Sequence, residues 1–77
     1  MNKEAFFDLF KNSKFIKPEC KDNITESASL FEDLMMDSFT TVLFIRELEN
    51  TLNKEMDFTI LSGVVTVGDL YERVKNL

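Results

Sequence analysis

The stretch from Ser38 to Leu52 constrains the fold of this chain most, because its apolar residues recur at the spacing of an α-helix. One stripe of apolar side chains falls on a single side of that helix and is expected to face a core. Its members are Phe44, Ile45, Leu48 and Leu52, with Thr41 beside them. Asn53 tolerates an unusual backbone conformation and Lys54 places a cation near the last carbonyls. We therefore predict a helix that spans residues 38–52.

The start of this helix has the features of a binding site for an anion. Asp37 is the predicted N-cap, because its carboxylate can accept hydrogen bonds from the free N–H groups of the first turn. Ser38 then takes the first helical position, with its Oγ at the positive end of the helix dipole. A phosphate attached there would meet unpaired amides and a partial positive charge. The site suits a phosphoester better than it suits catalysis.

A second apolar face on the same helix needs an explanation. Phe39 and Leu43 point nearly opposite to the core stripe, beside Arg46 and Asn50, and Val42 lies at the boundary. Large apolar groups among polar ones indicate a docking surface. The alternative is that a neighbouring loop folds over them. The candidate docking residues are Phe39, Val42, Leu43 and Arg46.

Helical patterns also occur at both ends of the chain. Residues 2–12 place apolar side chains on one face, and Asn2 is a suitable cap. Residues 57–61 are long enough for a single turn. Thr66 can cap a last helix, with Asp69 three residues later in a looser capping box. The apolar residues of this last helix are Val67, Leu70, Tyr71, Val74 and Leu77.

Gly68 stands in the first turn of that last helix. A glycine inside a helix costs about 1 kcal/mol relative to alanine. We therefore expect another part of the structure to require it.

The connection that precedes the central helix is long and lacks a sustained period. Residues 29–32 have the capping-box pattern and predict a short helical turn through Leu34. So long a connection needs apolar residues that pin it to the core, or a function. The predicted pins are Ile24, Leu30, Phe31 and Leu34. Cys20, the only cysteine, can form no internal disulfide and is interpreted as an incidental exposed thiol.

Length and composition predict one all-α domain over residues 1–77, with three main helices, one minor helix and a long first loop. No apolar run approaches the roughly 18 residues of a membrane helix, and the first residues do not resemble a signal peptide. We expect a monomer in the cytoplasm.

The charge and residue types exclude several functions. A formal net charge of −5 argues against nucleic acid as a ligand and favours a cationic protein surface as partner. With no histidine and a lone cysteine, neither a nucleophile–histidine pair nor a zinc site can be assembled. We do not expect an enzyme.

Residues 28–42 read Ala-Ser-Leu-Phe-Glu-Asp-Leu-Met-Met-Asp-Ser-Phe-Thr-Thr-Val. This segment resembles the modification segment of acyl carrier proteins and of their peptidyl and D-alanyl carrier relatives. The Thr66-Val67 pair that opens the last helix, the length and the order of elements are also similar to that family. The resemblance implies a four-helix acyl-carrier-like bundle.

The resemblance also implies a function. Ser38 would receive phosphopantetheine from coenzyme A through a separate magnesium-dependent phosphopantetheinyl transferase, and Asp37 would help that enzyme to position its metal. The terminal thiol of the arm, not Cys20, would hold acyl or aminoacyl cargo as a thioester. A loading ligase and downstream synthase or transferase enzymes of fatty-acid, polyketide, peptide or related biosynthesis would be the partners.

The sequence departs from the family pattern at some positions. Thr40 and Leu43 stand where fatty-acid carriers commonly have acids, and Met35 replaces a frequent glycine. These differences favour a D-alanyl, peptidyl or pathway-dedicated carrier. One alternative is a small helical interaction module that uses Phe39 and Leu43 without a cofactor. A DNA-binding helix-turn-helix is a more distant one, because its recognition helix would lack basic residues.

Overall fold

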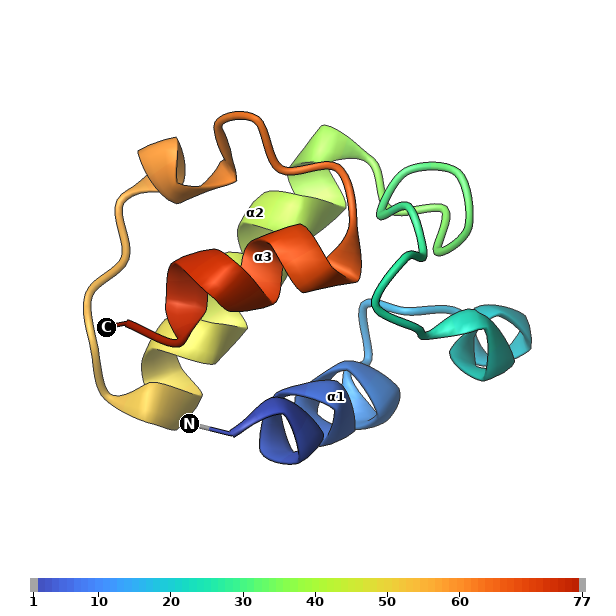
Figure 1. Ribbon diagram of the computed structural model, residues 1–77, viewed down its shortest axis with the longest axis horizontal. Coiled ribbons are helices and arrows are strands. Elements are labelled where there is room, and N and C mark those ends of the chain that lie inside the picture. Colours follow the sequence, from blue (N-terminus) through green and yellow to red (C-terminus); the bar gives the residue numbers. More distant parts are fainter. Residues whose placement is uncertain (1, 77) are drawn as a thin grey trace.

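The computed structural model describes residues 2–76, which form three α-helices and two short 3₁₀ helices without a β-strand. In chain order these are α1 (Lys3–Asn12), η1 (Pro18–Asn23), α2 (Ser38–Leu52), η2 (Phe58–Leu61) and α3 (Val67–Val74) (Figure 1). The prediction of an all-α, acyl-carrier-like fold is confirmed. Leu77, which was predicted to extend the last apolar stripe, lies outside the described residues.

Local sequence signals account for the ends of the α-helices. The Asn2 side chain accepts a hydrogen bond from the Ala5 N–H at the start of α1. At the end of α2, Asn53 adopts a left-handed conformation with φ of 54°. Thr66 and Asp69 form a complete capping box at the start of α3. All three helix starts, with Asp37 at the second, agree with the predictions.

Aromatic rings occupy the centre of the core. The ring centroids of Phe10 and Phe44 are 4.4 Å apart, and those of Phe6 and Phe10 are 5.1 Å apart. All three rings are completely buried, and burial of such a side chain contributes about 1.5–3 kcal/mol. Leu70 brings α3 into the same cluster. The core stripe predicted for residues 38–52 is therefore the face of α2 that meets α1 and α3.

The first loop is more structured than predicted. Pro18 begins the 3₁₀ helix η1, which buries the side chain of Cys20 in the core. The interpretation of Cys20 as an exposed thiol was wrong, because the sequence pattern did not reveal η1. Ile24, Leu30 and Leu34 are buried as predicted, whereas Phe31 is 51% exposed and is not a pin.

The helical turn predicted from Ser29 forms as one turn, because the Asp33 N–H donates to the Ser29 carbonyl over 3.0 Å. Ser29 Oγ accepts a hydrogen bond from the Glu32 N–H, but Asp33 rather than Glu32 accepts from the Ser29 N–H. Residues 30–33 make up this turn and Leu34 lies in a bend, so the turn does not continue as a helix. Ser29 also forms an isolated antiparallel bridge with Thr66, which ties the start of this turn to the residue before α3.

Contact between the first loop and the start of α3 also explains why residue 68 is a glycine. Its N–H donates to the Glu26 carbonyl over 2.9 Å, and a Cβ at this position would lie only 2.9 Å from that oxygen. The loop backbone therefore occupies the space that any side chain would need. Among residues 2–76, no helix is both long enough and apolar enough to cross a membrane.

We predict that Gly68→Ala destabilises the chain, although alanine is the better helix former by about 1 kcal/mol. The new methyl group must displace the Glu26 carbonyl, and overpacking of this kind typically costs about 1–3 kcal/mol. Urea unfolding followed by circular dichroism measures the effect. Glu72→Ala on the exposed side of α3 serves as the control and should change stability by no more than about 0.5 kcal/mol. An increase in stability for Gly68→Ala would contradict the contact.

Candidate functional site

Ser38 is the first residue of α2, and its side chain is exposed. The helix that follows is 15 residues long, so its dipole places a partial positive charge at this end. The hydroxyl is therefore reachable from solvent and lies where an attached anion is favoured.

Asp37 caps α2 through its side chain and its backbone. Its Oδ1 accepts a hydrogen bond from the Thr40 N–H over 2.7 Å, and its carbonyl accepts from the N–H and the hydroxyl of Thr41. The hydrogen bond from the Thr40 N–H, helped by the Thr40 hydroxyl and the Phe39 backbone, lowers the pKa of the Asp37 carboxyl below 3.8. Asp37 is thus an anion fixed next to Ser38.

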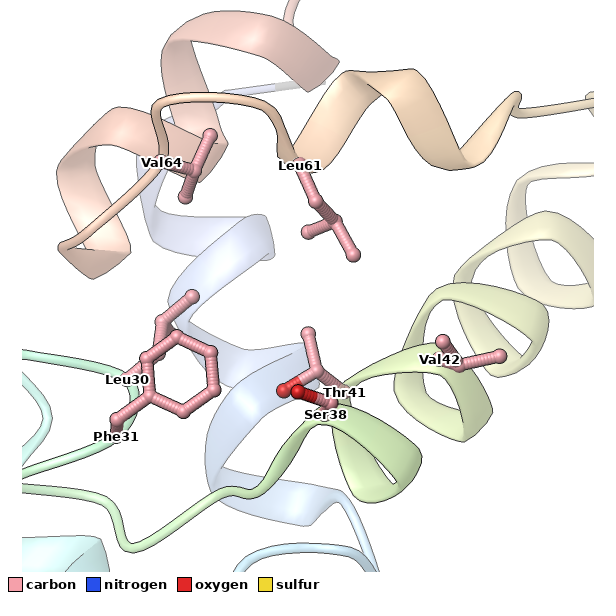
Figure 2. A pocket seen from close by; sticks show the side chains of 7 residues that line it. All are labelled: Leu30, Phe31, Ser38, Thr41, Val42, Leu61 and Val64. Atoms are coloured by element: carbon pink, nitrogen blue, oxygen red, sulfur yellow. The ribbon is translucent and has the colours of Figure 1, made fainter.

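A cavity of about 180 Å³ adjoins Ser38. Figure 2 shows that its walls come from three segments: the start of α2, the loop before it, and the chain around the end of η2. The lining residues are Leu30, Phe31, Ser38, Thr41, Val42, Leu61 and Val64. All of these except Ser38 and Thr41 are hydrophobic. The hydroxyl of Ser38 therefore stands at the edge of an apolar depression.

Met35 has an unusual backbone conformation three residues before Ser38. Its φ is 56°, in the left-handed region, and its side chain is 57% exposed. A side chain in this conformation costs about 1–2 kcal/mol. The neighbouring loop imposes it, because the Met36 N–H donates to the Leu30 carbonyl over 2.9 Å and the Met36 side chain is buried.

The predicted docking residues differ in their exposure and in the hollows that they line. Phe39 is 72% exposed, so no loop covers it. Val42 is partly buried and lines the cavity beside Ser38. Leu43 and Arg46 line a separate shallow groove with residues that include Phe15, which follows α1. Leu43 is thus partly covered, whereas Phe39 is exposed directly after the serine.

Some cavity residues were absent from the predicted site. Thr41 follows Ser38 by three positions, and helical geometry alone places it on the same face. Leu61 and Val64 come from a distant segment, and no local signal links them to Ser38. Only the folded chain brings them together.

Comparison with known proteins identifies the family. A model for a domain described as the phosphopantetheine attachment site matches residues 19–74, which include all of α2 and α3. The chain belongs to this family. It is also similar to an acyl carrier protein of Saccharopolyspora erythraea, with 38% identity over 56 residues. That match covers 73% of this chain and 59% of the length of the relative.

Family membership supports a carrier role rather than a catalytic one, and it gives phosphopantetheine as the cofactor. The described residues fit this group. The helix start favours the charge of a phosphodiester, and an exposed serine hydroxyl there can form an ester. The cavity next to Ser38 offers apolar contact to a flexible chain.

We predict that Asp37→Ala lowers the melting temperature at pH 7, because the first turn of α2 loses its side-chain acceptor. The pKa of Asp37 is lower in the folded chain than its ordinary 3.8, so its charge stabilises the fold above that value. This stabilisation is lost as the pH falls through the lowered pKa. The difference between wild type and variant should therefore shrink in acid.

Differential scanning fluorimetry at pH 7 and well below pH 3.8 measures this difference. Asp37→Asn is the matched control, because asparagine keeps the capping oxygen without the charge. Its deficit should be smaller than that of Asp37→Ala. A deficit for Asp37→Ala that stays constant into acid would rule out a contribution from the charge.

Proposed function

We propose that this chain is a discrete carrier domain that tethers acyl or aminoacyl intermediates as thioesters on a phosphopantetheine arm attached to Ser38. The observation that carries the proposal is the exposed Ser38 hydroxyl at the N-terminus of α2, within the segment matched by the family model. Its exposure leaves a route for an enzyme, and the buried face of α2 fixes the position of the attachment point.

The attachment step assigns a role to Ser38. Its Oγ forms a new bond to the phosphorus that carries the pantetheine in coenzyme A. The bond from that phosphorus to the rest of the diphosphate breaks, and adenosine 3′,5′-bisphosphate leaves. The proton of the Ser38 hydroxyl passes to a base of the transferase. The phosphodiester that results keeps one negative charge, which the helix dipole of α2 stabilises.

Asp37 has two roles in this proposal. It holds the first turn of α2 through Thr40, so that the backbone next to Ser38 is ordered before the transferase arrives. Its carboxylate is charged at pH 7, and the same hydrogen bond moves its pKa further below that pH. A charged oxygen beside Ser38 can help the transferase to position its magnesium ion.

The arm supplies the chemistry of the cargo, because its terminal thiol forms the thioester. Cys20 is buried and takes no part. The proposed partners are a phosphopantetheinyl transferase, a loading ligase, and downstream synthase or transferase enzymes of fatty-acid, polyketide, peptide or related biosynthesis. We propose that the chain meets them in the cytoplasm as a monomer, without nucleic acid as a ligand.

The proposal predicts a gain in mass. Incubation with coenzyme A, Mg²⁺ and a promiscuous phosphopantetheinyl transferase should add one phosphopantetheine, detected by intact-mass spectrometry. Ser38→Ala should abolish the gain. Ser27→Ala, which removes another exposed hydroxyl from the first loop, should leave it unchanged.

Failure of the wild type to gain mass, while a known carrier is modified in parallel, would overturn the proposal. The result would then favour a helical interaction module that works without a cofactor. Such a module would bind its partner equally well with and without Ser38.

A further inference from the structure

Three exposed apolar residues lie close to Ser38 in the chain. Phe31, Met35 and Phe39 are 51%, 57% and 72% exposed, respectively. They come from the loop before α2 and from its first turn. We call these three residues the apolar rim.

Packing within the fold does not explain why a methionine occupies position 35. The surrounding loop imposes a left-handed backbone at this residue, which glycine would adopt without strain. The Met35 side chain is mostly in solvent, so burial within the fold does not offset the strain. An exposed apolar group held in a strained conformation is more consistent with a contact made to another molecule.

The position of the rim identifies the occupant. Three residues span at most about 11 Å, so the Met35 Cα lies within this distance of the Ser38 Cα. A protein interface of standard size covers about 800 Å² on each partner, which corresponds to a disc with a radius of roughly 16 Å. An enzyme that reaches Ser38 Oγ is therefore expected to extend over Met35 as well as over Phe39. Phe31 lines the same cavity as Ser38 (Figure 2).

We propose that Met35 is a docking residue for the enzyme that modifies Ser38: together with Phe31 and Phe39 it contacts an apolar face of the phosphopantetheinyl transferase. This inference rests on the proposed attachment at Ser38. Met35 does not touch the reacting atoms. It affects only how tightly the transferase binds this chain. A methionine suits this role, since its flexible thioether adapts to an irregular apolar surface.

The test is the steady-state rate of arm transfer to the full chain at varied carrier concentration, with coenzyme A, Mg²⁺ and the transferase that modifies the wild type. Met35→Gly should raise KM for the carrier at least fivefold with little change in kcat, because a docking contact contributes equally to the ground state and the transition state. The same variant should melt no lower than the wild type, since the strain is relieved.

Two further variants separate apolar contact from backbone strain. Met35→Gln keeps the length and the strained backbone but not the apolar character, and it should raise KM by a similar factor. Met35→Leu keeps the apolar character and should stay within twofold of the wild type. Asn53→Gly is the matched control, because Asn53 has the same left-handed conformation (φ 54°) at the other end of α2, about 22 Å along the helix. Its KM should not change.

The outcomes distinguish this inference from the proposed function. If the wild type is not modified at all, attachment at Ser38 fails. If the wild type is modified but Met35→Gly and Met35→Gln keep its KM, attachment stands and the docking role is overturned. Equal losses in Met35→Leu would also overturn it, because the contact would not be apolar. Self-association of the wild type that Met35→Gly abolishes, with unchanged KM, would assign the rim to a second copy instead.

Discussion

A main-chain contact between residues 26–30 and residues 65–68 is the constraint on which the rest of the structure depends. The Leu30 N–H donates to the Val65 carbonyl, and the N–H groups of Val67 and Gly68 donate to the carbonyls of Ala28 and Glu26. These bonds tie the middle of the long first loop to the start of α3. Backbone polar groups that fold inward must find partners, and here the two segments satisfy each other. The start of α2 is positioned because the loop before it is held in this way.

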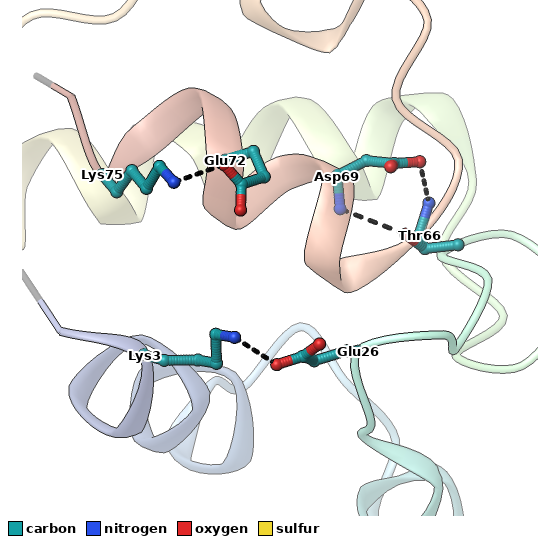
Figure 3. Close-up of polar contacts among 6 residues, drawn as sticks. All are labelled: Lys3, Glu26, Thr66, Asp69, Glu72 and Lys75. Carbon is teal, nitrogen blue, oxygen red and sulfur yellow. Dashed lines mark hydrogen bonds and ion pairs between the residues drawn. The ribbon is translucent and has the colours of Figure 1, made fainter.

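Side chains at the start of α3 support the same contact (Figure 3). Asp69 Oδ2 accepts hydrogen bonds from the N–H groups of Val65 and Thr66, while Thr66 Oγ1 accepts from the Asp69 N–H. The bonds from the Thr66 and Val65 backbone lower the pKa of Asp69. Lys3 of α1 forms an ion pair with Glu26, but both side chains are more than half exposed, so solvent screens this pair. The backbone contact and the helix cap dominate.

The two sides of α2 have different environments at the site. Thr41, Phe44 and Leu48 bury one side of α2, so the helix that carries Ser38 is anchored in the core. The other side of its first turn presents a hydroxyl, a charged cap and Phe39 to solvent. In the proposed function, this division gives a tethered cargo a fixed anchor and gives enzymes free access to it. The apolar surroundings of Ser38 also differ from an acidic docking face, so partners are expected to meet it through packing as well as through charge.

The sequence by itself determined the three α-helices, their caps and the place of Ser38 at a helix start. These features depend on residues within a few positions of one another, such as Asp37 with Thr40 or Thr66 with Asp69. Only the tertiary structure decided that Cys20 turns inward, that Ser29 pairs with Thr66, and that Phe31 stays exposed. It also decided the left-handed backbone of Met35 and the cavity beside Ser38. Their physical cause is contact between segments far apart in the chain, which local periodicity and capping preferences do not encode.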